Sequence, residues 1–79
     1  MLHLKIVSPE RTVFDGTAES VLAPGTLGQF EILTDHAPII STLEKGELAY
    51  KTSEGTMKVD ILGGFISVKQ NEVKACVEI

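Results

Sequence analysis

The residues that could do chemistry gather in residues 24–40, which hold two of the seven glycines, two of the three prolines and one of the two histidines. A catalytic interpretation would use His36 as a base, with Asp35 to orient it and Ser41 or Cys76 as nucleophile. Adjacent side chains of an extended backbone point apart, which argues against Asp35 orienting its neighbour. No Gly-x-Ser-x-Gly elbow presents a serine. The sequence therefore predicts no catalytic residue and no enzyme.

Metal binding is equally poorly supported by the spacing of the possible ligands. His3 and His36 lie far apart, and no His, Cys or carboxylate spacing matches a closed metal site. Cys76 is the only cysteine, so it cannot form an internal disulfide, and a reducing compartment suits it. We expect no metal and no cofactor, and we expect His36 to be a turn residue hydrogen-bonded to backbone.

The glycines of this stretch do not form a phosphate-binding loop. Gly25-x-x-Gly28 lacks the Gly-Lys-Ser/Thr ending and precedes no helix whose N-terminus could hold an anion. Glycine pairs in a β protein usually mark turns, bulges or places where another backbone comes close. We expect such a role for Gly25 and Gly28, and also for Gly63-Gly64.

Lys58 raises a different possibility, because Met57-Lys58 resembles the Met-Lys-Met motif of biotinyl and lipoyl carrier domains. A carrier lysine must stand at an exposed hairpin tip. Here the predicted tip is Ser53-Glu54-Gly55, and Lys58 falls inside the strand that follows. A solvent-facing strand lysine is therefore the preferred interpretation.

Composition excludes several further classes of protein. The net charge is −4 and the Lys and Arg residues do not cluster, which argues against nucleic acid and anionic lipid as partners. Neither a signal-peptide core nor an apolar run of membrane-spanning length is present. The 79 residues, 43% of them apolar, predict one small soluble domain spanning residues 1–79.

The elements that must position these residues are short strands, because apolar and polar residues alternate with a period of two along most of the chain. The alternating segments are 2–7, 12–14, 17–23, 30–32, 39–43, 47–51, 57–61, 66–68 and 73–77. Asp15-Gly16 is a hairpin-turn signal between the second and third segments. No window supports an amphipathic helix. Turn signals every eight to twelve residues predict an all-β sandwich or barrel.

Three motifs, in the same order and at similar spacing, resemble the epsilon subunit of bacterial F-type ATP synthase over the whole chain. The first motif is Leu4-x-Ile6-Val7-Ser8-Pro9-Glu10 with Val13-Phe14-x-Gly16. The second is Pro24-Gly25-x-x-Gly28-x-Phe30-x-Ile32-Leu33-x-x-His36-Ala37-Pro38, followed by Leu43-x-x-Gly46. The third is Gly63-Gly64-Phe65-x-x-Val68-x-x-Asn71-x-Val73.

The resemblance implies a small β-sandwich of two roughly five-stranded sheets and a non-catalytic role in the rotor of the synthase. The subunit would clasp the gamma subunit and rest on the polar loops of the membrane c ring, so that ion-driven rotation reaches the catalytic head. It would be a peripheral protein on the cytoplasmic face of the bacterial inner membrane. It would contact the membrane through the c ring and would not insert into lipid.

Matching positions imply two contact sets. The loop toward the c ring would consist of Leu27, Gly28, Gln29, Phe30 and Glu31. The residues toward gamma would be Ser8, His36 and Ser41.

The chain departs from the family pattern at two places. Glu31 stands where the family usually has glycine. The family often continues into a C-terminal helical hairpin that carries ATP binding and an inhibitory conformation, whereas this sequence ends at Ile79. We therefore expect neither ATP binding nor an inhibitory switch. A carrier domain and a stand-alone binding module remain the alternatives.

Overall fold

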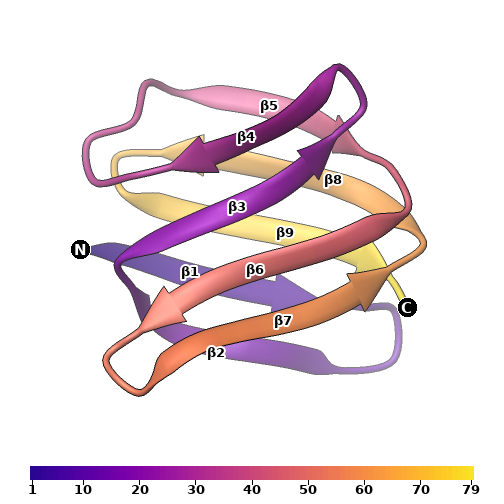
Figure 1. Cartoon of the computed structure of the whole chain (residues 1–79), viewed down its shortest axis with the longest axis horizontal. Helices are drawn as coiled ribbons and strands as arrows, with labels where there is room; N and C mark the ends of the chain where they lie inside the picture. Colours follow the sequence, from indigo (N-terminus) through magenta and orange to yellow (C-terminus); the bar gives the residue numbers. More distant parts are fainter.

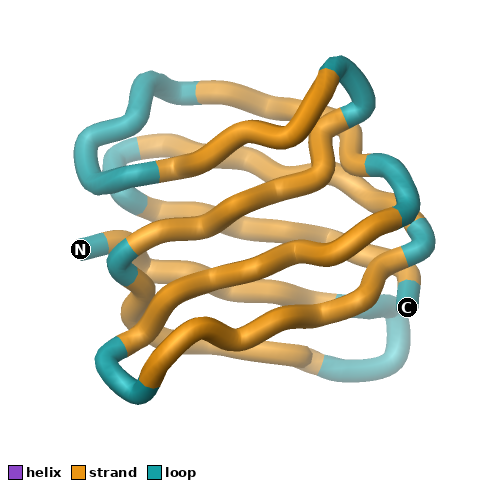
Figure 2. Tube along the Cα trace, in the orientation of Figure 1, coloured by secondary structure: helices purple, strands orange, loops and turns teal.

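Nine strands and no helix make up the computed structural model, which describes all residues 1–79 (Figures 1 and 2). The strands are β1 (Leu2–Val7), β2 (Thr12–Ala18), β3 (Ser20–Gly25), β4 (Gly28–Ile32), β5 (Ile39–Leu43), β6 (Gly46–Thr52), β7 (Gly55–Ile61), β8 (Gly63–Lys69) and β9 (Glu72–Glu78). The chain contains no helix with the length and apolar character needed to cross a bilayer.

The strands form two layers that face one another. In Figure 1, β4, β3, β6 and β7 make the near layer, and β5, β8, β9, β1 and β2 make the far layer. The strand order β2-β1-β9-β8-β5-β3-β6-β7 makes the layers one curled sheet, joined where Gly25 of β3 pairs with Leu43 of β5. This confirms the predicted β-sandwich, although its layers hold five strands and four.

Period-two alternation explains the core. In β1, Leu2, Leu4 and Ile6 are buried, while the residues between them face outward. Sixteen apolar residues form one buried cluster, and no polar or charged residue is buried. Each large aliphatic side chain that leaves water contributes about 1.5–3 kcal/mol, which offsets much of the ordering entropy of a chain this short.

The aromatic pair Phe14 and Tyr50 packs β2 against β6 between the layers. The ring centroids lie 4.6 Å apart, and the planes are tilted by 43°. Burial raises the pKa of the Tyr50 hydroxyl, because the apolar surroundings disfavour the phenolate. The two layers are therefore held together by side-chain packing at the edge opposite their shared hydrogen bonds.

The predicted turn at Asp15-Gly16 is wrong, because both residues lie inside β2. Lys5 pairs with Asp15 and Leu4 pairs with Gly16, so β2 continues to Ala18. The breaks in the chain lie on either side of β2: before it, where the Ser8 amide donates to the Arg11 carbonyl at 2.8 Å, and after it, at Glu19.

The Phe14 ring explains why a glycine, Gly16, lies in the middle of β2. A Cβ at Gly16 would lie 3.1 Å from the tip of the Phe14 ring, so glycine leaves room for the ring over the strand. The segment 17–23 is likewise two strands, because β2 ends at Ala18 and β3 begins at Ser20.

Candidate functional site

The candidate contact loop is a tight hairpin between β3 and β4. Gly25 pairs with Gly28, so only Thr26 and Leu27 form the turn at its tip. Gly28 has a φ of +129°, which glycine adopts without strain. Leu27 is fully exposed, at 104% of its reference area. The hairpin therefore presents one large apolar side chain to solvent at one end of the sandwich (Figure 1).

The base of this hairpin is anchored to β5 and to the segment after it. The Thr26 amide donates to the Thr42 carbonyl at 3.2 Å, and the Thr26 and Thr42 hydroxyls lie 2.8 Å apart. The Glu44 amide donates to the Pro24 carbonyl at 2.9 Å. These bonds hold the turn against the far layer, so the exposed tip stands on a fixed base.

Gly25 is required by close packing, as the sequence predicted. A Cβ there would lie 2.8 Å from the Gly28 carbonyl oxygen and 2.9 Å from the Phe30 ring. The Phe30 ring turns inward and packs against the core. Of the five residues expected to face a partner ring, Phe30 is thus the one that supports the loop from within.

The remaining residues of that set are exposed. Leu27, Gly28, Gln29 and Glu31 all present accessible surface. Glu31 pairs with Leu22 across the hairpin and forms no salt bridge within the chain. Its carboxylate is therefore available to a basic group outside this chain.

The second predicted set does not come together at one point. Ser8 lies in the β1–β2 turn, at the same end of the sandwich as Leu27, whereas His36 lies in the β4–β5 connection at the opposite end (Figure 1). Ser41 is half-buried within β5 and donates to the Thr42 carbonyl at 3.1 Å.

The turn that carries His36 is tied to the β8–β9 turn. The Asp35 amide donates to Asn71 Oδ1 at 2.6 Å, and Asn71 Nδ2 donates to Asp35 Oδ1 at 3.1 Å. Both residues have positive φ, 65° and 64°. His36 Nδ1 lies 2.7 Å from the Ala37 carbonyl oxygen, which confirms the expected turn histidine bonded to backbone.

This geometry pairs none of the candidate catalytic groups with one another. The imidazole of His36 contacts the Ala37 carbonyl, Ser41 contacts the Thr42 carbonyl, and Cys76 lies on β9. Nucleophilic catalysis needs nucleophile and base within hydrogen-bond reach, and neither His36 nor Ser41 is bonded to another of these candidates. No group of three His, Cys, Asp or Glu residues is arranged to hold a metal ion.

Lys58 lies inside β7, as predicted, and not at the hairpin tip. Its ammonium is 3.6 Å from Glu47 Oε1 on β6. A carrier lysine has to swing freely on a tip, so this position argues against the carrier-domain alternative.

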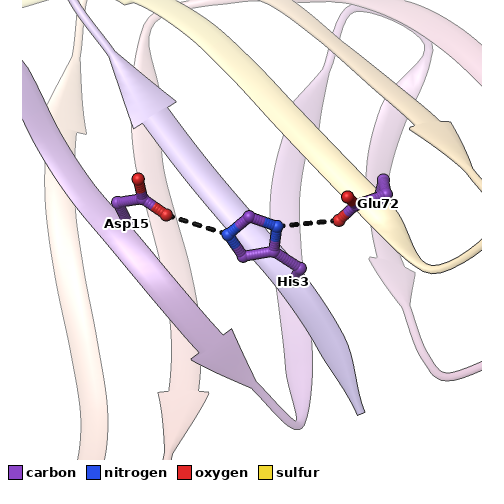
Figure 3. A network of polar contacts seen from close by, with 3 residues as sticks. All are labelled: His3, Asp15 and Glu72. Carbon is purple, nitrogen blue, oxygen red and sulfur yellow. Dashed lines mark hydrogen bonds and ion pairs between the residues drawn. The ribbon is translucent and has the colours of Figure 1, made fainter.

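One polar contact group was not predicted from the sequence: it is formed by His3, Asp15 and Glu72 (Figure 3). His3 Nε2 lies 2.8 Å from Asp15 Oδ1, and His3 Nδ1 lies 2.8 Å from Glu72 Oε2. The hydrogen bond with Asp15, followed by the one with Glu72, raises the pKa of His3 above 6.5. Alternation places His3 on the outer face of β1, but only the fold reveals that β9 lies beside it.

The fold is an all-β sandwich with an exposed hairpin, and comparisons with known proteins identify its family. The family model for the ATP synthase delta/epsilon chain, β-sandwich domain, matches residues 1–79. The chain belongs to this family, which confirms the resemblance stated from the motifs.

Curated relatives agree with this family. The chain is 40% identical to the ATP synthase epsilon chain of Synechococcus elongatus over 76 residues, which are 96% of this chain and 56% of the relative. It is 42% identical to the chloroplastic epsilon chain of Pylaiella littoralis over 72 residues, 91% of this chain and 54% of the relative. The chain thus spans about half the length of the curated relatives it matches.

Solved structures share the fold at low identity. A chain of the Euglena gracilis mitochondrial ATP synthase (OSCP/F1/c-ring) matches with a TM-score of 0.89 and 18% identity, over 96% of this chain and 49% of that one. A chain of the Tetrahymena thermophila mitochondrial ATP synthase (central stalk and c ring) matches with a TM-score of 0.81 and 16% identity, over 99% and 63%.

Proposed function

We propose that this chain acts as a non-catalytic rotor component of an F-type ATP synthase, linking the gamma subunit to the membrane c ring. The epsilon chains that it resembles at about 40% identity support this role. The family match over the whole chain supports it as well. In this role the domain couples ion-driven rotation to ATP synthesis without chemistry of its own.

The observation that carries the proposal is the exposed β3–β4 tip on its anchored base. A fully exposed leucine offers a protein partner an apolar side chain to bury, and burial of such a side chain is favourable. We assign Leu27, Gly28, Gln29 and Glu31 to the surface that meets a c-ring polar loop. Phe30 lies on β4 of the same hairpin and acts by holding the tip in place.

The sandwich suits a part that transmits torque. Its two layers share one continuous sheet and one core cluster, so the hairpin cannot move without disturbing the packed core. A stiff body of this kind passes a load from one contact surface to another with little internal displacement.

Ser8, His36 and Ser41 remain the proposed contacts with gamma. Because Ser8 and His36 lie at opposite ends of a body with principal extents of 26 × 25 × 18 Å, a gamma contact using all three must run along the length of the sandwich. The two hydrogen bonds between Asp35 and Asn71 would then hold the His36 turn in position for that contact.

We further propose that the domain is peripheral to the cytoplasmic face of a bacterial inner membrane through the c ring, and that residues 1–79 bind no ATP. The tight Gly25-to-Gly28 turn supports the second statement, because neither a lysine nor a helix N-terminus accompanies it.

Disulfide cross-linking tests the contact loop. In a Cys76→Ser background, Gln29→Cys should form a disulfide with a cysteine placed on a c-ring polar loop of the intact complex. The matched control is Glu54→Cys, which lies in the β6–β7 turn at the opposite end of the sandwich (Figure 1). Equal cross-linking from both positions, or none from Gln29→Cys, would overturn the loop assignment. Failure of the chain to co-purify with gamma would favour a stand-alone binding module.

A further inference from the structure

The polar group His3, Asp15 and Glu72 joins three neighbouring strands on the outer face of the far layer. β1 lies between β2, with which it pairs antiparallel, and β9, with which it pairs parallel. The imidazole lies between the two carboxylates, one on each side, and each ring nitrogen is 2.8 Å from a carboxylate oxygen (Figure 3). One side chain of β1 thus bridges both of its neighbours.

We propose that His3, Asp15 and Glu72 form a pH-dependent tie across β2, β1 and β9, closed when the imidazole is protonated and open when it is neutral. A neutral imidazole carries one N–H and one bare nitrogen, whereas the imidazolium donates from both nitrogens. Two ionised carboxylates can only accept hydrogen bonds. Both observed contacts are therefore satisfied only by the protonated ring.

The surrounding charges show that each carboxylate turns to the imidazole in spite of other cations nearby. Lys5 on β1, Lys69 on β8 and Lys74 on β9 are the cationic groups beside the tie. The anionic Asp35 also lies near it, hydrogen-bonded to Asn71, whose carbonyl accepts the His3 amide. Lys5 pairs directly with Asp15, and Lys69 pairs directly with Glu72. Neither pair forms a salt bridge, since both carboxylates bond to His3.

The contacts with both carboxylates set the direction of the pH dependence. They raise the pKa of His3 above 6.5 in the folded chain, with the Asp15 hydrogen bond the largest cause. A raised folded pKa means that the tie contributes its full stability below pH 6.5 and loses it as pH rises through the folded value. Because the three side chains are exposed, salt also weakens the tie.

The position of the tie determines what it controls. The β1–β9 pairing is the one parallel pairing in the sheet, and it joins the first strand of the chain to the last. β2 lies at the edge of the far layer. Opening of the tie therefore loosens the β1–β2 hairpin from β9 on the alkaline side, while the apolar inner face keeps the strands packed.

An NMR titration of the chain tests the proposal directly. We expect the ring carbon protons of His3 to titrate above pH 6.5, and Asp15→Asn and Glu72→Gln each to lower that titration. The His36 ring, which contacts the Ala37 carbonyl, controls for a general effect of the two substitutions on the spectra. A His3 titration at 6.5 that neither substitution moves would overturn the proposal.

Unfolding measurements test its consequence for stability. From pH 5.5 to a pH above the His3 titration, the urea midpoint of the wild type should fall by more than that of His3→Gln. His36→Gln, the matched control, should follow the wild type. Equal pH dependence in the wild type and in His3→Gln would contradict a tie that contributes to stability.

Discussion

A substitution at Leu27 can distinguish an effect on the free energy of unfolding from an effect on the free energy of partner binding. Its side chain is fully exposed, so Leu27→Ser removes no buried area and should change the free energy of unfolding by less than about 0.5 kcal/mol. If a partner buries this side chain, its loss should cost about 1.5–3 kcal/mol of binding free energy. That difference corresponds to an increase of about 10- to 150-fold in Kd.

The assay is a binding titration of the chain against a c ring that carries gamma, paired with urea unfolding of the chain alone. Met57→Ser is the control, because Met57 is 47% exposed and lies on β7, toward the opposite end of the sandwich from Leu27. Met57→Ser should bind like the wild type, even if losing the buried part of the Met57 side chain lowers the free energy of unfolding.

Two results would refute the reasoning about Leu27. One is an unchanged Kd for Leu27→Ser, since the tip would then lie outside the interface. The other is a loss of more than about 1 kcal/mol in the free energy of unfolding, well above the range typical of exposed sites, since the side chain would then support the fold.

Two further predictions concern backbone geometry. Gly64→Ala should lower the free energy of unfolding by about 1–3 kcal/mol or more, because its Cβ would overlap the Cys76 carbonyl and lie 2.9 Å from Val77 Cα; a wild-type urea midpoint would contradict that clash. Asn71→Ala should cost about 1–2 kcal/mol, because alanine disfavours its φ of 64°. Asn71→Gly adopts this φ without strain, so it removes only the two hydrogen bonds with Asp35. If both variants lose the same free energy of unfolding, backbone strain is excluded as a cause.

Much of the fold could be predicted from local pattern. Alternation along β1 and β9 identified strands whose buried faces are the ones observed, for example Leu2 and Leu4. The turn at Asp15-Gly16 could not be judged locally, because Gly16 serves the packing of Phe14 and not a chain reversal. The same dipeptide suits both uses, and only the pairing of β2 with β1 distinguishes them.

The candidate contact site was partly predictable. The glycine spacing and the family motif indicated a loop at residues 25–31, and the structure shows a hairpin with its tip at Thr26 and Leu27. The inward direction of Phe30 and the separation of Ser8 from His36 depend on where the strands lie in three dimensions.

The glycines, the alternation and the motif order were sufficient to predict a β-sandwich of the epsilon-chain family. Strand identity and family motifs are carried by residues close together in the chain. Only the tertiary structure brought His3 to Glu72, 69 residues away, because the parallel pairing of β1 and β9 is a long-range contact. The physical reason is that backbone alternation decides which face a side chain occupies, whereas the neighbour it meets there depends on how the whole sheet closes.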